Sequence, residues 1–218
     1  MDRQSVKSYR SRGPCQLFGS FTQPGRFGRC SSHHQLPCRA PQDCPGCGNA
    51  KYWRLFIRSL EFLRFIAAPK ASGETFELAT DIKEESVRNQ FLENGWRLSL
   101  PHDLSSDWNL YRRFLQGSKG EFTVAKDQYV RLNTGWFSDR TACYLACGRP
   151  AITQETGFTR FYGGQRGLFS FRTLEEIPEA VREINADYAA HCQAAWEVAH
   201  EYFEAEKVLA DLLERAGV

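Results

Sequence analysis

The sequence lacks any long apolar stretch and carries little net charge. No run of apolar residues approaches the roughly 18 needed to cross a membrane. The 218-residue chain has a formal net charge of +2, without the strong basic excess that is typical of a nucleic-acid-binding surface. The N-terminus is basic but lacks the apolar segment of a secretory signal peptide. We therefore expect a cytoplasmic protein with no membrane span and no nucleic acid among its partners.

Residues 1–50 lack the apolar periodicity of a folded domain. They are rich in Arg, Ser, Pro, Gly, Gln and Cys, a composition that cannot bury enough apolar surface to offset its ordering entropy. We predict that this segment is disordered, or is the non-native product of a shifted reading frame. The alternative is a zinc site, because Cys44 and Cys47 have the spacing of a zinc knuckle. Further ligands would then come from Cys30, His33, His34 and Cys38.

Residues 51–218 read as one domain in which short strands alternate with helices. Strands are predicted over 75–80, 96–100, 121–126, 149–154 and 168–171, and helices over 55–66, 83–95, 105–118, 138–147, 173–184, 185–203 and 204–216. Ser105 or Ser106 would cap the third of these helices. Thr173 and Glu176 have capping-box spacing, and Pro178 requires a kink or a later helix start. The alternation predicts an α/β fold: a Rossmann-like parallel sheet with helices on both faces and a helical C-terminus.

The stretch GWFSDRTACYLACGRPAITQETGF, at 135–158, indicates an anion site. In open parallel sheets ligands lie beyond the carboxyl ends of the strands, where the predicted helix at 138–147 begins. Ser138 or Asp139 would cap this helix, whose first-turn N–H groups favour phosphate. Gly135 would let the backbone approach closely, and Arg140 and Lys126 would add positive charge.

The next strand leaves the sheet at the same edge. It is followed by residue types that commonly bond hydroxyl-rich ligands, namely Gln154, Glu155, Thr156 and Gly157. The carboxylate of Asp139 repels phosphate, so this residue would bond a sugar or ribose hydroxyl, or only cap the helix. An ordinary helix cap followed by a turn is the simpler interpretation of the whole pattern.

The same residues resemble the donor-binding region of GT-B glycosyltransferases. In that region a helix ends in Ala-x-Gly-x-Pro, here ACGRP at 146–150, and a strand and a polar-Gly segment follow, here AIT at 151–153 and ETG at 155–157. The likeness covers roughly residues 52–218. It also includes GEFTVAKDQYVRLNTGWFSDR, GLFSFRTLEEIPEAVREINADY and EYFEAEKVL, which are similar to one bacterial subgroup of glycosyltransferase-like proteins.

The resemblance implies that residues 51–218 form the Rossmann-like C-terminal half of a GT-B enzyme. This half would bind a nucleotide diphosphate sugar and donate the sugar to an unknown acceptor, with no bound metal and no other cofactor. No catalytic residue is assigned. The expected donor-binding residues are Lys126, Gly135, Ser138, Asp139, Arg140, Gln154, Glu155, Thr156 and Gly157.

Two departures from the GT-B pattern keep a second interpretation open. Many retaining members carry two glutamates eight positions apart, and Gly135 and Cys143 stand at those places. A GT-B enzyme also has a first Rossmann-like domain, for which residues 1–50 are too few. We therefore expect a truncated or frame-shifted protein that lacks its acceptor domain and has little activity of its own. The alternative is a non-catalytic Rossmann-like binding or assembly module.

Overall fold

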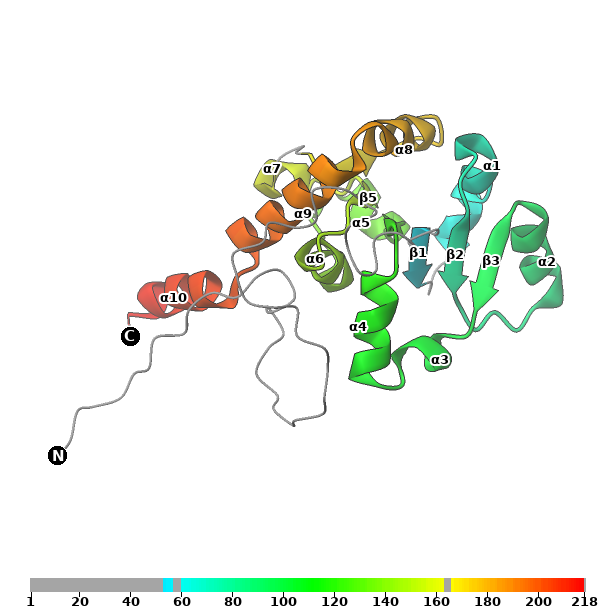
Figure 1. The fold of residues 1–218 in the computed structure, drawn as a ribbon. Helices are drawn as coiled ribbons and strands as arrows, with labels where there is room; N and C mark the ends of the chain where they lie inside the picture. The colour runs from blue at the N-terminus through cyan, green and yellow to red at the C-terminus, as the bar shows by residue number, and fades with distance from the viewer. Residues whose placement is uncertain (1–52, 57–59, 163–165, 218) are drawn as a thin grey trace.

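The computed structural model describes residues 53–56, 60–162 and 166–217, and it contains one parallel sheet of six strands (Figure 1). The strand order is β3-β2-β1-β4-β5-β6, so the chain changes direction across the sheet between β1 and β4. This order is that of a Rossmann-like sheet and confirms the predicted fold class. The strands are β1 Trp53–Phe56, β2 Phe76–Ala79, β3 Trp96–Ser99, β4 Gly120–Thr123, β5 Ala151–Gln154 and β6 Leu168–Phe171.

Helices cover both faces of this sheet. One face packs against the 3-10 helix η2 (Leu60–Phe65), α1 (Ala68–Ser72), α2 (Glu85–Glu93) and α8 (Glu176–Ala186). The other face packs against α4 (Trp108–Gln116), α6 (Asp139–Ala146) and α9 (Tyr188–Tyr202). Short helices α3 (Pro101–Ser105), α5 (Asp127–Arg131) and α7 (Thr159–Tyr162) lie in the connections. The right-handed crossovers of parallel strands require this division of helices between the faces.

The larger core is built from aromatic rings. Phe122 in β4 is fully buried and stacks on Phe171 in β6, with ring centroids 5.2 Å apart. Phe76 meets Phe122 edge-on at 5.3 Å and also packs against Trp96. Burying one such ring contributes about 1.5–3 kcal/mol, so these rings account for much of the attraction between the sheet and its helices.

The helix predicted over 55–66 is wrong at residues 55 and 56. Residues 53–56 form β1, which lies between β2 and β4 in the sheet, and residues 60–65 form a 3-10 helix. The apolar spacing fits a helix, but pairing with two neighbouring strands overrides local periodicity. Helical spacing in so short a run does not distinguish a helix from a buried strand.

Two predicted helix starts are also corrected. The first turn of α4 is capped by Asp107, whose side chain accepts hydrogen bonds from the N–H groups of Asn109 and Leu110, and not by Ser105 or Ser106. Helix α8 begins at Glu176 and not at Thr173, which is the later start that Pro178 predicts, and Pro178 falls in its first turn. Proline is tolerated there because the first N–H groups have no partner within the helix.

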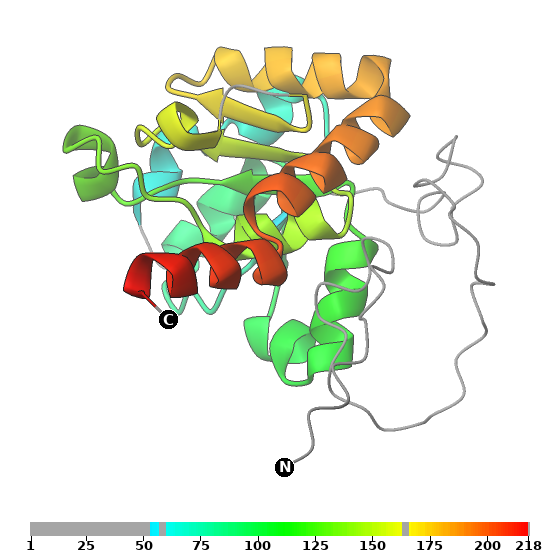
Figure 2. The same ribbon diagram turned by 90° about the vertical axis from the view of Figure 1, so that its left-hand side faces the viewer.

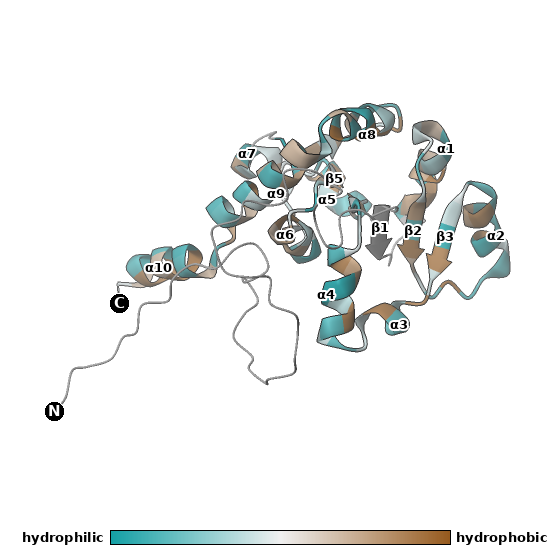
Figure 3. Ribbon diagram, in the orientation of Figure 1, coloured by the Kyte–Doolittle hydropathy of each residue, from teal (hydrophilic) through white to brown (hydrophobic). Residues whose placement is uncertain are grey.

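The last helix, α10 (Ala205–Ala216), stands apart from the sheet in Figure 1, and Figure 2 shows it in red in front of the domain. All its residues are exposed, although Figure 3 shows hydrophobic residues interleaved with hydrophilic ones along it. Val208, Leu209, Leu212 and Leu213 are each about half exposed. An aliphatic stripe of this kind on a helix usually faces a packing partner, and the described part of the chain supplies none.

Among the described residues, no helix is long and apolar enough to span a membrane. The predictions for residues 1–50, the zinc alternative included, lie outside the described residues.

Candidate functional site

The candidate site lies where β4 and β5 end, on the far side of the strand-order reversal from β2 and β3. Gln154, the last residue of β5, is buried, and its side-chain oxygen accepts a hydrogen bond from the N–H of Ala125 at 3.0 Å. This bond ties the segment that follows β4 to the end of β5. The loops that follow β4 and β5 therefore begin at a fixed distance from each other.

The loop before α6 is fastened to the loop after β5 by two hydrogen bonds. The N–H of Gly135 donates to the carbonyl of Thr156 at 2.7 Å, and the hydroxyl of Thr156 donates to the carbonyl of Trp136 at 2.5 Å. Gly135 has φ +77°, where a side chain is strained, and a Cβ there would lie 2.7 Å from the ring of Phe161. The structure thus brings the glycine and the polar segment together, as the sequence predicts.

Glu155 and Gly157 shape the second of these loops. One carboxylate oxygen of Glu155 accepts from the N–H of Gly157 at 2.5 Å. The other is buried and finds no hydrogen-bond partner in the described part of the chain. Gly157 has φ +93°, and a Cβ would come within 2.5 Å of the side-chain oxygen of Asn133. The loop is therefore closely packed, and its glycine cannot be replaced without displacing Asn133.

Helix α6 begins at this edge of the sheet. Ser138 is its buried N-cap residue, but the Ser138 side chain makes no capping hydrogen bond. The exposed carboxylate of Asp139 accepts from the N–H of Arg140 at 2.9 Å. Within the described chain, the N–H groups of Asp139 and Thr141 make no hydrogen bond. Two first-turn donors are thus left for a bound anion.

Arg140 points toward the sheet. Its Nε donates to the carboxylate of Glu121 at 2.6 Å, and an Nη donates to the hydroxyl of Thr123 at 2.8 Å. The side chain of Glu121 is fully buried, and that of Arg140 is 20% exposed. Burial opposes the guanidinium charge, but the charge and hydrogen bond of Glu121 outweigh burial and raise the pKa of Arg140. The ion pair joins α6 to β4.

Lys126 is an exposed cation of the site. It directly precedes α5, and its carbonyl accepts the first hydrogen bonds of that helix. Its ammonium group makes no ion pair with any described residue. Lys126 therefore presents a positive charge just after β4 that no described carboxylate pairs with.

Cys143, at one of the positions where many GT-B enzymes carry glutamate, is half-buried in α6. Burial, together with the charge of Asp139, raises the pKa of its thiol to about 11. The thiol is neutral at physiological pH and cannot replace a carboxylate that accepts hydrogen bonds from a sugar or ribose.

Arg160 is a site residue that the sequence did not reveal. Its Nε donates to the carbonyl of Gly157 at 3.1 Å and an Nη donates to the carbonyl of Asn133 at 2.9 Å. The guanidinium thus joins the two loops a third time. Asn133 has φ +50°, but neither residue lies in a pattern that would have identified this contact across 27 residues.

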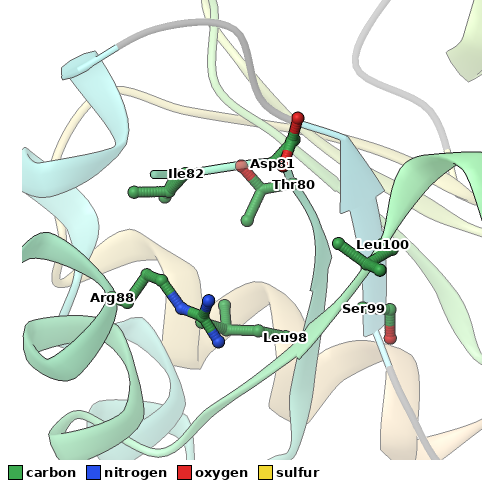
Figure 4. A pocket seen from close by; sticks show the side chains of 7 residues that line it. All are labelled: Thr80, Asp81, Ile82, Arg88, Leu98, Ser99 and Leu100. Carbon is green, nitrogen blue, oxygen red and sulfur yellow. The ribbon is translucent and has the colours of Figure 1, made fainter. Parts of the chain in front are cut away.

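A separate small pocket opens at the carboxyl ends of β2 and β3 (Figure 4). Arg88 reaches into it from α2 toward Leu98, with Thr80 and Asp81 on the β2 side. Among the described residues, no group of three or more His, Cys, Asp or Glu side chains is placed to hold a metal ion.

Comparison with solved structures identifies the fold. TarM matches with a TM-score of 0.53 at 11% identity, covering 76% of this chain and 35% of TarM. A chain of the GtfA/B complex matches with a TM-score of 0.53 at 16% identity, covering 77% of this chain and 36% of that one. AviGT4, a glycosyltransferase involved in avilamycin A biosynthesis, matches with a TM-score of 0.42 at 10% identity.

No family model matches the chain, and no curated protein matches it. The chain spans about a third of the length of TarM and of the GtfA/B chain. At these identities the likeness establishes the fold alone. The described residues have the architecture of one Rossmann-like half of a GT-B glycosyltransferase.

Proposed function

We propose that this protein binds a nucleotide diphosphate sugar, at the edge formed by Lys126, the N-terminus of α6 and residues 154–157, for transfer of the sugar to an acceptor. The observation that carries the proposal is the pair of hydrogen bonds between Gly135–Trp136 and Thr156. These bonds hold the segment that leads into α6 against the polar loop that follows β5.

In this proposal the diphosphate is held by backbone and by an exposed cation. The N–H groups of Asp139 and Thr141 donate to its oxygens, the helix dipole adds to their effect, and Lys126 supplies a positive charge. Ser138 sets the start of the helix. Arg140 acts as a positioning residue, because its guanidinium is paired with Glu121.

The sugar and ribose hydroxyls would face residues 154–157. Gln154 and Thr156 already have hydrogen-bond partners within the fold, so they hold the loop in place. Glu155 has one carboxylate oxygen without a partner. We propose that a small movement of this loop lets the Glu155 oxygen accept a ligand hydroxyl, which would relieve the cost of about 1–3 kcal/mol of a buried acceptor without a bond.

Transfer itself would need a second domain. The chain spans about a third of TarM, and the proposal includes an acceptor-binding domain formed by residues other than those described. The described residues alone would then bind donor and show little catalysis.

A second candidate is a binding or assembly module without chemistry. Gly135 and the neutral thiol of Cys143 stand where many GT-B enzymes carry acids, and this observation favours the module. Nucleotide affinity distinguishes the two candidates.

The test is a thermal shift of the full chain with uridine, guanosine and thymidine diphosphates and their sugars. Ligand at about 100 times its dissociation constant should stabilise the fold by about 2.7 kcal/mol. The sharpest variant is Asp139→Pro, which removes one proposed phosphate donor. Proline is accepted at the first position of a helix, and the preceding residue, Ser138, is already extended with φ −82° and ψ 131°.

Asp139→Ala is the matched control, because it removes the same carboxylate and keeps the N–H. We expect Asp139→Pro to weaken nucleotide binding and Asp139→Ala to preserve or improve it. Equal affinities in the two variants would show that the diphosphate does not use this helix. A folded wild-type chain that no nucleotide stabilises would leave the module as the function.

A further inference from the structure

Three aromatic side chains lie beside the candidate site: Phe161 contacts Gly135, Trp136 follows that glycine in the chain, and Tyr129 stacks on Trp136. We name them the aromatic surface: Tyr129 from α5, Trp136 from the loop before α6, and Phe161 from α7. The rings of Tyr129 and Trp136 are stacked, with centroids 5.0 Å apart and planes 13° from parallel. Phe161 lies on the glycine itself, since a Cβ on Gly135 would come within 2.7 Å of its Cε2.

The aromatic surface is open to solvent although its backbone is held firmly. Phe161 is 61% exposed, and Tyr129 and Trp136 are half-buried. The carbonyl of Trp136 accepts from Thr156, and the carbonyl of Tyr129 accepts from the N–H of Thr134 at 3.2 Å. An exposed aromatic ring on a fixed backbone loses little freedom when a ligand packs against it.

The neighbouring Phe137, unlike the rings of the aromatic surface, packs in the core. It stacks on Phe203 with centroids 5.4 Å apart and also packs against Phe158, within the cluster beneath α9. Trp136 instead packs on Tyr129 outside that cluster. Of these two consecutive aromatic residues, Phe137 therefore packs in the core, and Trp136 lies at the carboxyl edge of the sheet.

Hydrogen-bonding groups border the aromatic surface. The guanidinium of Arg160 lies 5.8 Å from the Phe161 ring centroid and is anchored by the carbonyls of Gly157 and Asn133. Asn133 and Thr134 are exposed beside it. A pyranose ring presents an apolar C–H face bordered by hydroxyl groups. Aromatic rings pack well against the C–H face, and the polar side chains around them can hydrogen-bond the hydroxyl groups.

We propose that the aromatic surface is a saccharide subsite, in which Phe161 and the Tyr129–Trp136 pair pack against the apolar face of a pyranose ring. This inference rests on the proposed function, because the subsite adjoins the proposed donor site through the bonds of Thr156. The ring belongs either to the donor or to an acceptor saccharide. A protein partner is less suited to this bordered aromatic patch than to the aliphatic stripe on α10.

The test measures binding of two sets of probes to the full chain by titration calorimetry and ligand-observed NMR. The first set compares UDP-glucose, GDP-mannose and dTDP-glucose with the corresponding nucleoside diphosphates. The second set is methyl glucoside, maltose and chitobiose. The variants are Phe161→Ala, Phe161→Trp and the control Leu132→Ala, which removes a 70% exposed aliphatic side chain near the same loop.

We expect Phe161→Ala to weaken saccharide binding at least tenfold, Phe161→Trp to retain it, and Leu132→Ala to change it less than twofold. If Phe161→Ala weakens the binding of nucleotide sugars alone, the pyranose ring belongs to the donor. If it weakens the binding of free saccharides, the ring belongs to an acceptor. The subsite is overturned if the wild-type chain binds nucleotide sugars no more tightly than nucleoside diphosphates and binds no free saccharide. It is also overturned if Phe161→Ala changes saccharide binding no more than Leu132→Ala does.

The two proposals fail separately in this experiment. Binding of the nucleoside diphosphates with no contribution from any sugar would leave the donor site standing and overturn the subsite. Saccharide binding that depends on Phe161, without binding of any nucleotide, would support the subsite and overturn the donor site.

Discussion

Replacing Arg140 by methionine should destabilise the fold strongly and in a pH-dependent way. The substitution keeps much of the aliphatic volume and leaves the carboxylate of Glu121 fully buried without its cation. The second oxygen of Glu121 already lacks a hydrogen-bond partner among the described residues. Breaking one side of a buried ion pair typically costs about 3–5 kcal/mol.

Proton uptake sets a ceiling on this cost. An ordinary glutamate has a pKa of about 4.3, so protonating one at pH 7 costs about 3.7 kcal/mol, and at pH 5 about 1 kcal/mol. A buried carboxylate without a cation takes up a proton once that is the less costly option. We therefore expect Arg140→Met to lose about 3–3.7 kcal/mol of unfolding free energy at pH 7, and much less at pH 5.

The assay is urea denaturation followed by circular dichroism at both pH values. Glu121→Gln should cost less than Arg140→Met, because the side chain of Arg140 is 20% exposed and can reach water. The double variant should recover stability relative to Arg140→Met, since no buried charge remains. A loss below about 1 kcal/mol at pH 7, or a loss that is the same at pH 5, would refute the assigned ion pair.

Three further predictions concern the rest of the fold. Gly167→Ala should lower the unfolding free energy, measured by denaturation, by about 3 kcal/mol or more, because φ is +85° and the new Cβ would lie 2.8 Å from the Cα of Ala195 in α9. The control Gly73→Ala, at φ +68° with open space around it, should lower it by about 1 kcal/mol. Burial lowers the pKa of His191, whose Nδ1 accepts from the N–H of Gly167. The unfolded chain then binds the proton more readily, so stability should fall as pH drops below 6.5, and His191→Gln should reduce that slope between pH 7.5 and 5.5. Deleting residues 205–218 should change the unfolding free energy by no more than about 1 kcal/mol, because every described residue of α10 is exposed; a larger loss would show that α10 packs on the domain.

Much of the sheet could be predicted because its strands carry strong local signals. LFSF coincides with β6, and AITQ ends where β5 ends. Strand β1 was missed because its apolar residues also fit a helical period. Its identity depends on β2 and β4, which pair with it from positions far along the chain.

The candidate site was predicted as a place but not as a set of contacts. Glycine at 135 and the polar run after β5 mark the carboxyl edge in the sequence. The direction of Arg140 could not be predicted, because it depends on Glu121 lying beneath α6 on the neighbouring face of β4. The bond between Gly135 and Thr156 likewise joins loops that only the sheet order brings together.

The position of α10 also bears on the proposed second domain. The helix is amphipathic, and its aliphatic stripe is exposed. In the proposed function, this stripe is a surface on which a second domain would pack.

The most direct test of the donor site is NMR mapping of backbone amides during titration with nucleoside diphosphates. The proposal predicts that the largest shift changes fall on Asp139, Arg140 and Thr141 and on residues 155–157. Asp139→Pro, which has no amide proton at 139, should reduce the changes at the other five positions. Changes centred on the pocket between β2 and β3, or no changes at saturating nucleotide, would contradict the proposal that the α6 N-terminus binds the diphosphate.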